Sequence, residues 1–388
     1  MARVTRTKRG DAGRAKLCAL VLGAAVWLCA PALPAQVVST QEHSFRVVKL
    51  VEGLEHPWSV AFLPDGRLLV TERPGRLRIV GRDGKLAPRP VSGLPEIAEY
   101  GQGGLLDVVL HPRYADNGLI YFSFAGRGKG GVSTEVGRGR LSGNRLEDVQ
   151  VIFRQQPKTG ARQHFGSRLV FDRAGFLYIT LGDRGERDRA QKHDDHAGSV
   201  IRLHDDGRVP NDNPFVGRPG WKAEKYTLGH RNMQGAALHP ETGLLWTHEH
   251  GPQGGDEVNV IRPGVNYGWP VITYGREYVT GFRIGEGTQK AGMAQPIHHW
   301  VPSIAPSGMA FYTGDKFPRW RGNLFVGALR DRLLVRLRLD GQRVLSEERM
   351  LEEVLGRIRD VRSGPDGYLY LLTDSDDGIL ARLEPAER

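Results

Sequence analysis

Six stretches of the chain share one pattern of apolar and polar positions. Each has a short apolar run, a polar turn containing glycine, and a second apolar run rich in leucine, β-branched and aromatic residues. Runs of this kind, bounded by turn residues, predict the two strands of a β-hairpin. The six stretches begin at Trp58, Leu105, Ser167, Gly235, Ser307 and Ile358. Their turn glycines, spaced 45 to 79 residues apart, are Gly66, Gly118, Gly175, Gly243, Gly322 and Gly367.

Shorter apolar runs after these hairpins predict outer strands. They are GRLRIV from Gly75, SVIRL from Ser199, VNVI from Val258 and LLVRLRL from Leu333. The stretch LSEERMLEEVLGRI is helix-like in composition but lies between two hairpins. Repeats of about four strands predict an all-β fold, a six-bladed β-propeller with four-stranded antiparallel blades, in one domain over residues 36–388. An array of β-sandwiches is the alternative, and the lack of linkers between the repeats disfavours it.

Residues 1–35 are predicted to form a cleaved secretory signal. Six basic side chains precede an apolar run from Leu17 to Ala30, and small-residue cleavage sites end at Ala32 and Ala35. The apolar run is shorter than the roughly 20 residues of a spanning helix, so we expect no stable membrane insertion. The pattern predicts a periplasmic or secreted bacterial protein.

Composition narrows the possible functions. Both cysteines, Cys18 and Cys29, lie within the predicted signal, so the mature chain would use neither disulfides nor thiol chemistry. The formal charge of the whole chain is +10, and the signal carries six basic side chains and Asp11, which leaves +5. No run of five basic residues remains, which argues against a partner that is nucleic acid or a membrane surface.

In a propeller the inner strands line a central channel, and the loops at one end form the site. His164 stands just before the third repeat, and Asp183 follows its second strand. A carboxylate beside an imidazole orients the ring and favours its protonated form, so the pair is a candidate general base with its orienting partner. A lone histidine is more often a hydrogen-bonded structural residue, and that alternative stays open here.

Basic and amide side chains occupy similar positions in other repeats. Arg231 and Asn232 precede the fourth repeat in GHRNMQG, Arg330 lies in GALRDRLL, and Arg357 and Arg359 are alternate residues of one strand. The arginine fork suits a carboxylate or phosphate. Surface ion pairs are the simpler explanation for any single arginine. Arginines from three repeats in one channel would repel one another without an anion, which predicts a ligand with several carboxylates.

The stretch EHGPQGGDEVNVIRPGVNYGWP suggests a cation site. Calcium takes carboxylate and carbonyl oxygens from irregular loops, and this segment offers Gly251, Pro252, Asp256, Glu257 and the Tyr267 carbonyl. It has no EF-hand spacing. Two nearby histidines, His248 and His250, raise zinc as an alternative, which the lack of an obvious third ligand disfavours.

Taken together, these motifs resemble the soluble pyrroloquinoline quinone (PQQ)-dependent aldose sugar dehydrogenase family, which is related to the soluble quinoprotein glucose dehydrogenases. The resemblance runs in order through HPWSVAFLPDGRLLVTERPGRL, GQGGLLDVVLHP, HFGSRLVF, LGDRG, GHRNMQG, EHGPQGGDEVN, NYGWP, PSGMAFYTGDKFP, GNLFVGAL, RIRDV and GPDGYLYLLTD. It implies the six-bladed propeller reached above. The sequence departs from the family at Arg330, where members often have lysine, and at Gln163, where the glucose-oxidising branch has aspartate.

The resemblance also implies roles for single residues. His164 is similar to the family's catalytic base, and Gly251 and Pro252 resemble the loop whose carbonyls hold the catalytic calcium. Glu257 and Tyr267 resemble a further calcium site. The expected quinone contacts are Gln102, Arg231, Asn232, Arg357 and Arg359.

The implied reaction is oxidation of an aldose sugar at C1 to a lactone, with hydride transfer to the quinone. Electrons would then pass to an external acceptor that the sequence does not identify, and the protein would be a monomer or a homodimer. Two other classes of function remain open. A calcium-dependent propeller lactonase or esterase would not need arginines from three repeats, and a non-catalytic ligand-binding propeller would not need His164.

Overall fold

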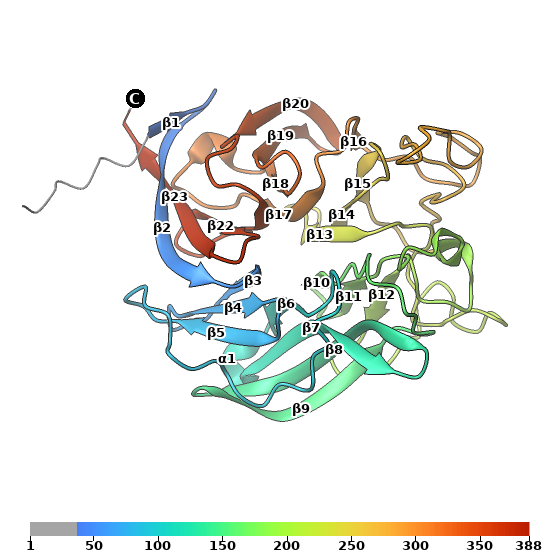
Figure 1. The fold of residues 1–388 in the computed structure, drawn as a ribbon, viewed down its shortest axis with the longest axis horizontal. Coiled ribbons are helices and arrows are strands. Elements are labelled where there is room, and N and C mark those ends of the chain that lie inside the picture. The colour runs from blue at the N-terminus through green and yellow to red at the C-terminus, as the bar shows by residue number, and fades with distance from the viewer. Residues whose placement is uncertain (1–36, 388) are drawn as a thin grey trace, which may run out of the picture. The chain divides into compact units, whose positions relative to one another are not determined.

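The computed structural model describes residues 37–387, which form six antiparallel sheets arranged around a common centre (Figure 1). The predicted six-bladed β-propeller is confirmed. We number the sheets as blades one to six in chain order. Blade one contains β3 (Pro57–Phe62), β4 (Leu68–Glu72) and β5 (Arg76–Val80). Blade two contains β6 (Leu105–Leu110), β7 (Leu119–Gly128), β8 (Gly131–Ser142) and β9 (Arg145–Arg154). Blade three contains β10 (Leu169–Phe171), β11 (Leu177–Thr180) and β12 (Val200–Leu203).

The second half of the chain builds the other three blades. Blade four contains β13 (Met233–Leu238), β14 (Leu245–Glu249), β15 (Asp256–Val260) and β16 (His298–Trp300). Blade five contains β17 (Pro306–Phe311), β18 (Leu324–Ala328), β19 (Leu334–Asp340) and β20 (Arg343–Met350). Blade six contains β21 (Ile358–Ser363), β22 (Leu369–Thr373), β23 (Gly378–Ala386), β2 (Ser44–Leu54) and β1 (Val37–Ser39). The helices described are short: α1 (Tyr114–Asn117), and the 3₁₀ turns η1 (Arg187–Gln191) and η2 (Pro318–Trp320).

Each predicted hairpin forms the inner two strands of a blade. All six turn glycines have positive φ, between 64° and 87°, a conformation that glycine adopts without steric cost. The predicted outer strands correspond to β5, β12, β15 and β19. The helix-like stretch contains no helix; most of its first half belongs to β20 and pairs with β19.

The number of strands per blade varies from the predicted four. Blades one and three have three strands each, and the segments that follow them are rich in proline and glycine: APRPVSGLP from Ala87 and VPNDNPFVGRPG from Val209. Proline has no N–H to donate to a ladder, and the first of these segments forms an isolated bridge, Ser92 with Arg145, in place of a fourth strand. Blade six has five strands because two come from the N-terminal end of the described chain.

The ring closes through the pairing of β2 with β23. The two strands are antiparallel, with Val47 opposite Leu383 and Ser44 opposite Ala386. A strand from near residue 44 therefore completes the blade formed by the C-terminal residues, as the blue and red arrows in Figure 1 show. This pairing holds the first and last blades together and so fixes the geometry of the channel between them.

The apolar core lies between neighbouring blades. Leu69 and Leu77 of blade one pack in one cluster with Leu105 and Phe122 of blade two, all of them fully buried. Similar clusters join the other neighbours. The side chains that face the centre of the ring from the inner strands include polar and charged ones.

A buried ionic network occupies that centre. Asp107 on β6 and Asp360 on β21 both contact the Arg168 guanidinium, at 3.2 and 2.9 Å. Arg362 reaches the same two carboxylates, each at 2.8 Å. Because these residues come from blades two, three and six, the network ties opposite sides of the ring together.

Two further findings concern membranes and the N-terminus. Within residues 37–387, no helix combines the length and apolar character needed to cross a membrane. The predicted signal and its two cysteines lie outside the described residues.

Candidate active site

The predicted site residues lie at one end of the ring. The start of each inner strand and the end of the next strand meet at the same end of an antiparallel hairpin. Arg231 and Asn232 stand immediately before β13, and Arg357 immediately before β21. Asp183 follows β11 by three residues, and His250 directly follows β14. Hairpin topology therefore brings together side chains far apart in sequence.

His164 and Asp183 form the predicted pair. Nδ1 of His164 lies 2.6 Å from Oδ1 of Asp183, and Nε1 of Trp269 donates to the other carboxylate oxygen at 2.8 Å. With Nδ1–H directed at Asp183, Nε2 is the nitrogen that can accept a proton. His164 has φ of 56°, a left-handed conformation that is uncommon outside glycine and that is held here by the surrounding contacts.

Burial sets the protonation of this pair. Burial lowers the pKa of His164, and nearby Arg231 lowers it further, while the bond to Asp183 acts in the opposite direction. Burial would raise the pKa of Asp183, but the hydrogen bond from His164 and the charge of Arg231 keep it below its ordinary value. At neutral pH the pair is therefore a neutral imidazole beside a carboxylate.

The loop that carries His164 is fixed from both sides. The side-chain oxygen of Gln102 accepts a hydrogen bond from the His164 backbone N–H at 2.8 Å. Arg184 donates to the carbonyls of Gln163 and Ala161, at 2.5 and 2.6 Å. Asn232 accepts from the backbone N–H of Gly166 at 3.1 Å. Gln102 and Asn232 thus support the loop directly, in addition to any contact with a ligand.

Arg231 is buried next to this pair. Its guanidinium lies over the Trp269 ring at 5.4 Å and donates to the carbonyl of His250 at 3.0 Å. The hydroxyl of Tyr278 lies 3.4 Å from its other terminal nitrogen. The guanidinium is thus oriented by three neighbours beside the His164–Asp183 pair.

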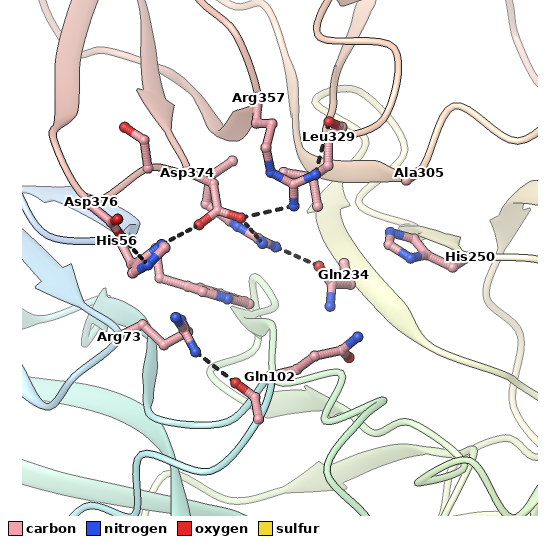
Figure 2. Close-up of a pocket in the computed structure, with 14 residues that line it drawn as sticks. His56, Arg73, Gln102, Gln234, His250, Ala305, Leu329, Arg357, Asp374 and Asp376 are labelled. Atoms are coloured by element: carbon pink, nitrogen blue, oxygen red, sulfur yellow. Dashed lines mark hydrogen bonds and ion pairs between the residues drawn. The ribbon is translucent and has the colours of Figure 1, made fainter.

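Two cavities open at this end of the ring. The first, of about 520 Å³, is lined by Gln102, Gln234, Arg357, Arg359 and Asp374 among others (Figure 2). The second, of about 740 Å³, is lined by Gly251, Pro252, Tyr278 and Arg330 among others. His250 and Ala305 line both cavities, so the two are neighbours. In Figure 2 these shared residues lie on the opposite side of the first cavity from His56 and Asp374.

The predicted arginines divide among neighbouring cavities. Arg357 and Arg359 line the first cavity, Arg330 lines the second, and Arg231 lines a third, much smaller one. His250 lines all three. Arg330 is exposed and donates to the Ser303 carbonyl at 2.6 Å.

In one corner of the site, a protein carboxylate offsets part of the charge of the predicted arginines, and the ligand anion stays a prediction. Asp374 accepts from Arg359 at 2.7 Å and from Arg357 at 3.1 Å, so a protein carboxylate already offsets part of their charge. Asp374 also binds His56, whose other nitrogen lies 2.8 Å from Asp376. We call His56, Arg357, Arg359 and Asp374 the arginine corner.

A third cavity, of about 10 Å³, has two carboxylates, Glu249 and Glu257, in its lining. Glu249, Glu257 and Tyr267 line it, and the volume corresponds to about one water-sized species. Glu249 binds His230 at 2.8 Å and the Arg231 backbone N–H. Glu257 accepts only the Asn259 amide, at 3.3 Å, and within residues 37–387 no lysine or arginine forms an ion pair with it. We call Glu249, Glu257, Asn259 and Tyr267 the carboxylate pocket.

The charge in this pocket is unbalanced. Burial raises the pKa of Glu257 well above its ordinary value, and the charges of Glu249 and Asp256 raise it further. No cluster of three or more His, Cys, Asp or Glu side chains suited to a metal occurs in the described part of the chain. A metal here would therefore need carbonyl oxygens as well as carboxylates.

The Gly-Pro loop lies next to this pocket. Gly251 and Pro252 are buried, and a Cβ at Gly251 would lie 2.2 Å from the carbonyl oxygen of Gly254, so only glycine fits there. Asp256 ties the loop to the segment before β17 by accepting from the Gly251 and Ile304 N–H groups, both at 2.8 Å. The loop is thus held in a tight, defined turn.

The two histidines weighed as zinc ligands point to different surroundings. His248 is fully buried against Gly235, and burial lowers its pKa to about 3. His250 lines the cavities, and its Nε2 bonds to the carbonyl of Pro306 at 2.5 Å.

Sequence reasoning missed several residues of the site. They are His56, Arg73, Gln234, Trp269, Tyr278 and Asp374. A usable signal existed for one of them. An acidic residue ends the second strand of a repeat or follows it within three residues in four repeats, at Glu72, Asp183, Glu249 and Asp374. Each binds a group near the start of an inner strand. Only Asp183 was recognised in this way.

Known proteins resemble this chain over nearly its whole length. A family model described as glucose/sorbosone dehydrogenase matches residues 54–382. The chain is 45% identical over 372 residues to aldose sugar dehydrogenase YliI of Escherichia coli K12, a match that covers 94% of this chain and 96% of that protein. The matched residues of the family model contain every candidate site residue from His56 to Asp374.

Two solved structures extend the comparison. The soluble aldose sugar dehydrogenase of E. coli in its apo form has a TM-score of 0.86 at 46% identity, covering 88% of this chain and 100% of that one. The PQQ-bound aldose sugar dehydrogenase of Streptomyces coelicolor has a TM-score of 0.72 at 30% identity, covering 88% and 98%.

Proposed function

Because this chain belongs to the glucose/sorbosone dehydrogenase family, we propose that it oxidises aldose sugars at C1 to lactones, using PQQ and calcium. The chain is a dehydrogenase of the PQQ-type aldose sugar group. The observation that supports C1 oxidation is the buried His164–Asp183 pair beside Arg231, at the end of the ring where the cavities meet.

The residues around the cavities fit a flat anion with several carboxylates. The cavities of about 520 and 740 Å³ fall within the range of small-molecule sites, about 300 to 1,000 Å³. Two arginines of the arginine corner share the single carboxylate of Asp374, which leaves positive charge for an anion. Arg231, Asn232 and Arg330 offer donors from the neighbouring blades, and Gln102 lines the first cavity with the arginine corner. We assign these residues to quinone binding.

The donor set of the loop fits calcium. Calcium takes six to eight oxygens from carboxylates and carbonyls. Glu257 has spare acceptor capacity and no cationic partner within residues 37–387, beside a cavity of about one water volume. We assign Glu257 and the Tyr267 carbonyl to one calcium site, and the carbonyls of Gly251 and Pro252 to the calcium that works with the quinone.

His164 is the proposed general base. When bound, the quinone supplies the hydride acceptor and calcium supplies a Lewis acid. Nε2 of His164 takes the proton of the anomeric hydroxyl as C1 is oxidised, since its lowered pKa keeps the imidazole neutral at pH 7. Asp183 remains ionised, fixes the tautomer and stabilises the imidazolium that forms. Trp269 and Arg231 cover the pair and limit access of water.

Three features of this proposal concern what lies outside the site. Electrons pass to an external acceptor, because the described chain offers no cysteine or second redox group to hold them. The predicted signal favours a periplasmic or secreted location, with no role for nucleic acid. The working form is a monomer or a homodimer, which light scattering of the purified protein would distinguish.

Reconstitution tests the activity. We expect the purified protein to reduce a dye with an aldose only when PQQ and calcium are both added. Lactone hydrolysis without such reconstitution would favour the lactonase alternative. Neither activity, with sugar or quinone binding retained, would favour the non-catalytic alternative.

A substitution tests the base. His164→Ala should lower turnover by about 10²- to 10⁴-fold while quinone binding, measured by absorbance titration, stays largely intact. His299→Ala, at an exposed histidine on β16, is the matched control and should keep full turnover. Loss of quinone binding in the His164 variant would instead make it a cofactor contact.

A further inference from the structure

A loop between β15 and β16 contributes Arg276, Tyr278 and Gly281 to the lining of the second cavity. It belongs to the long connection seen in yellow and orange beyond β15 in Figure 1. Three consecutive residues, 276–278, tie it to three different parts of the site. The Arg276 backbone pairs in both directions with Gln253, at 3.0 and 3.2 Å, and the Glu277 carboxylate takes both terminal nitrogens of Arg187, at 2.6 and 3.1 Å.

The third tether is Tyr278, whose hydroxyl lies 3.4 Å from Arg231. Gln253 belongs to the Gly-Pro loop, Arg187 begins the turn that follows Asp183, and Arg231 stands beside His164. Residues 276–278 are therefore held by contacts to the Gly-Pro loop, to the turn after Asp183 and to Arg231.

Despite these tethers, the Tyr278 side chain is not buried. It is 63% exposed and lines the second cavity together with Val301, which is 62% exposed. A tyrosine held for packing would hide its ring, because burying an aromatic ring is its main contribution to stability. Here the hydroxyl end lies 3.4 Å from Arg231 and a ring surface is left open to the cavity.

The position of Tyr278 connects it to the reacting end of the site. Arg231 lies over Trp269, Trp269 donates to Asp183, and Asp183 binds His164. Each contact is direct, so the Tyr278 ring is placed at a fixed offset from the base. A ligand resting on the ring would be held in a defined orientation relative to Nε2 of His164.

We propose that Tyr278 is a specificity-determining residue that binds the pyranose ring of the aldose, with the apolar C–H face of the sugar against the aromatic ring. This inference rests on the proposed function and names how its substrate is held. A pyranose has one face rich in C–H groups and a rim of hydroxyls. The ring of Tyr278 with Val301 meets the face, and polar groups of the same cavity, such as Arg276 and Gln253, meet the rim.

The test separates sugar binding from quinone binding. In enzyme loaded with PQQ and calcium, Tyr278→Ala should raise KM for aldoses about tenfold with a smaller change in kcat. Binding of 1,5-anhydroglucitol, a pyranose without the anomeric hydroxyl, should weaken by the same factor in calorimetry. PQQ titration of the apo-protein should be unchanged. Tyr278→Phe keeps the ring and should stay within about twofold of wild type in all three measurements.

Controls cover folding and loop position. Val279→Ala, at the 97% exposed neighbouring residue, should change nothing. Glu277→Gln removes the charge that holds Arg187 and should raise KM less than the alanine variant does. Melting temperatures of all variants should agree with wild type, since Tyr278 is mostly exposed.

Two results would overturn the proposal. One is an unchanged KM and unchanged anhydroglucitol binding in Tyr278→Ala. The other is an equal loss in the alanine and phenylalanine variants with weakened PQQ binding, which would mean that the hydroxyl acts only by placing Arg231. Failure of the wild-type protein to oxidise aldoses would instead refute the proposed function, so the two failures are distinct.

Discussion

The arginine corner and the carboxylate pocket lie at the same end of the propeller, but their charges are handled in opposite ways. In the arginine corner, Asp374 accepts from Arg357 and Arg359, so the protein supplies its own counter-charge. In the carboxylate pocket, Glu249 is satisfied by His230, whereas the one side-chain donor to Glu257 in the described part of the chain is the Asn259 amide. The arginine corner is partly neutralised by its own carboxylate, whereas Arg231 lines the cavity of the carboxylate pocket and no lysine or arginine within residues 37–387 forms an ion pair with Glu257.

The pKa shifts follow this difference. Burial would raise the pKa of Asp374, but Arg359, His56 and Arg357 hold it well below its ordinary value. Burial raises the pKa of Glu257, and no cation opposes it among the described residues. The comparison teaches that residue types alone do not identify an ion site. The unbalanced region, and not the region with the most charges, is the one where an added cation would be stabilised.

The largest effect we expect is in the arginine corner. Asp374→Ala leaves Arg359, whose side chain is 10% exposed, without its carboxylate, and breaking such a buried pair costs about 3 to 5 kcal/mol. Urea unfolding should show this loss. Asp376→Ala is the matched control, since that side chain is 94% exposed and contacts only the outer nitrogen of His56; its midpoint should barely move. Equal effects of the two variants would mean that the corner is not held by its internal pairing.

Calcium should act on the other region. At a concentration about 100-fold above its Kd, calcium should stabilise the wild-type protein by about 2.7 kcal/mol. Glu257→Gln removes the unpaired carboxylate, so the calcium-free variant should be at least as stable as wild type but gain much less from the ion. Calorimetric melting with calcium and with chelator measures both quantities. A full calcium gain in the variant would place the ion elsewhere.

The two regions should also respond to pH with opposite signs. The folded-state pKa of Glu257 is raised, so in chelator its contribution is present below about pH 4.5 and is lost as pH rises. The folded-state pKa of Asp374 is lowered, so its contribution is present above about pH 3.8 and is lost as pH falls. Glu249, Asp256, His230 and Asn259 surround Glu257 and set the size of the first effect.

Free energies of unfolding measured as a function of pH would separate the contributions of Glu257 and Asp374. Relative to wild type without calcium, Glu257→Gln should become increasingly favourable as pH rises, by on the order of 1 kcal/mol. Calcium should remove that trend because it binds the ionised carboxylate. A trend that is the same with and without calcium would show that the carboxylate pocket does not take up the ion.

The contrast also explains which parts of the molecule could be predicted from sequence. The six hairpins were predictable because strand alternation and turn glycines are local signals, as at Gly66 and Gly367. The pairing of His164 with Asp183 was predictable because both stand at the ends of strands in one repeat. The charge balance of the arginine corner could not be predicted. Asp374 and Arg357 meet through the register of β21 with β22, which no local sequence pattern specifies.

Irregular segments account for the other differences. The strand number of blades one and three depends on proline-rich segments whose backbone cannot complete a ladder. Tyr278 lies in a connection without strand or helix periodicity, so its approach to Arg231 had no sequence signal. The sequence identifies most of the residues proposed to bind ligands. The ion pairs that some of them form within the protein depend on the tertiary structure.

The smallest effect we expect is at Arg330, a residue outside both regions of the comparison. Arg330 is exposed, lines the second cavity and donates to the Ser303 carbonyl, so it belongs to neither the arginine corner nor the carboxylate pocket. Arg330→Lys keeps the charge, and its unfolding free energy should differ from wild type by less than about 0.5 kcal/mol. PQQ affinity of the lysine variant should change only a few-fold. Arg330→Ala should weaken PQQ binding more, and its PQQ affinity should fall less steeply with rising salt because one cation is missing. If lysine weakened PQQ binding as much as alanine, the guanidinium fork and not the charge would be what the cofactor requires at this position.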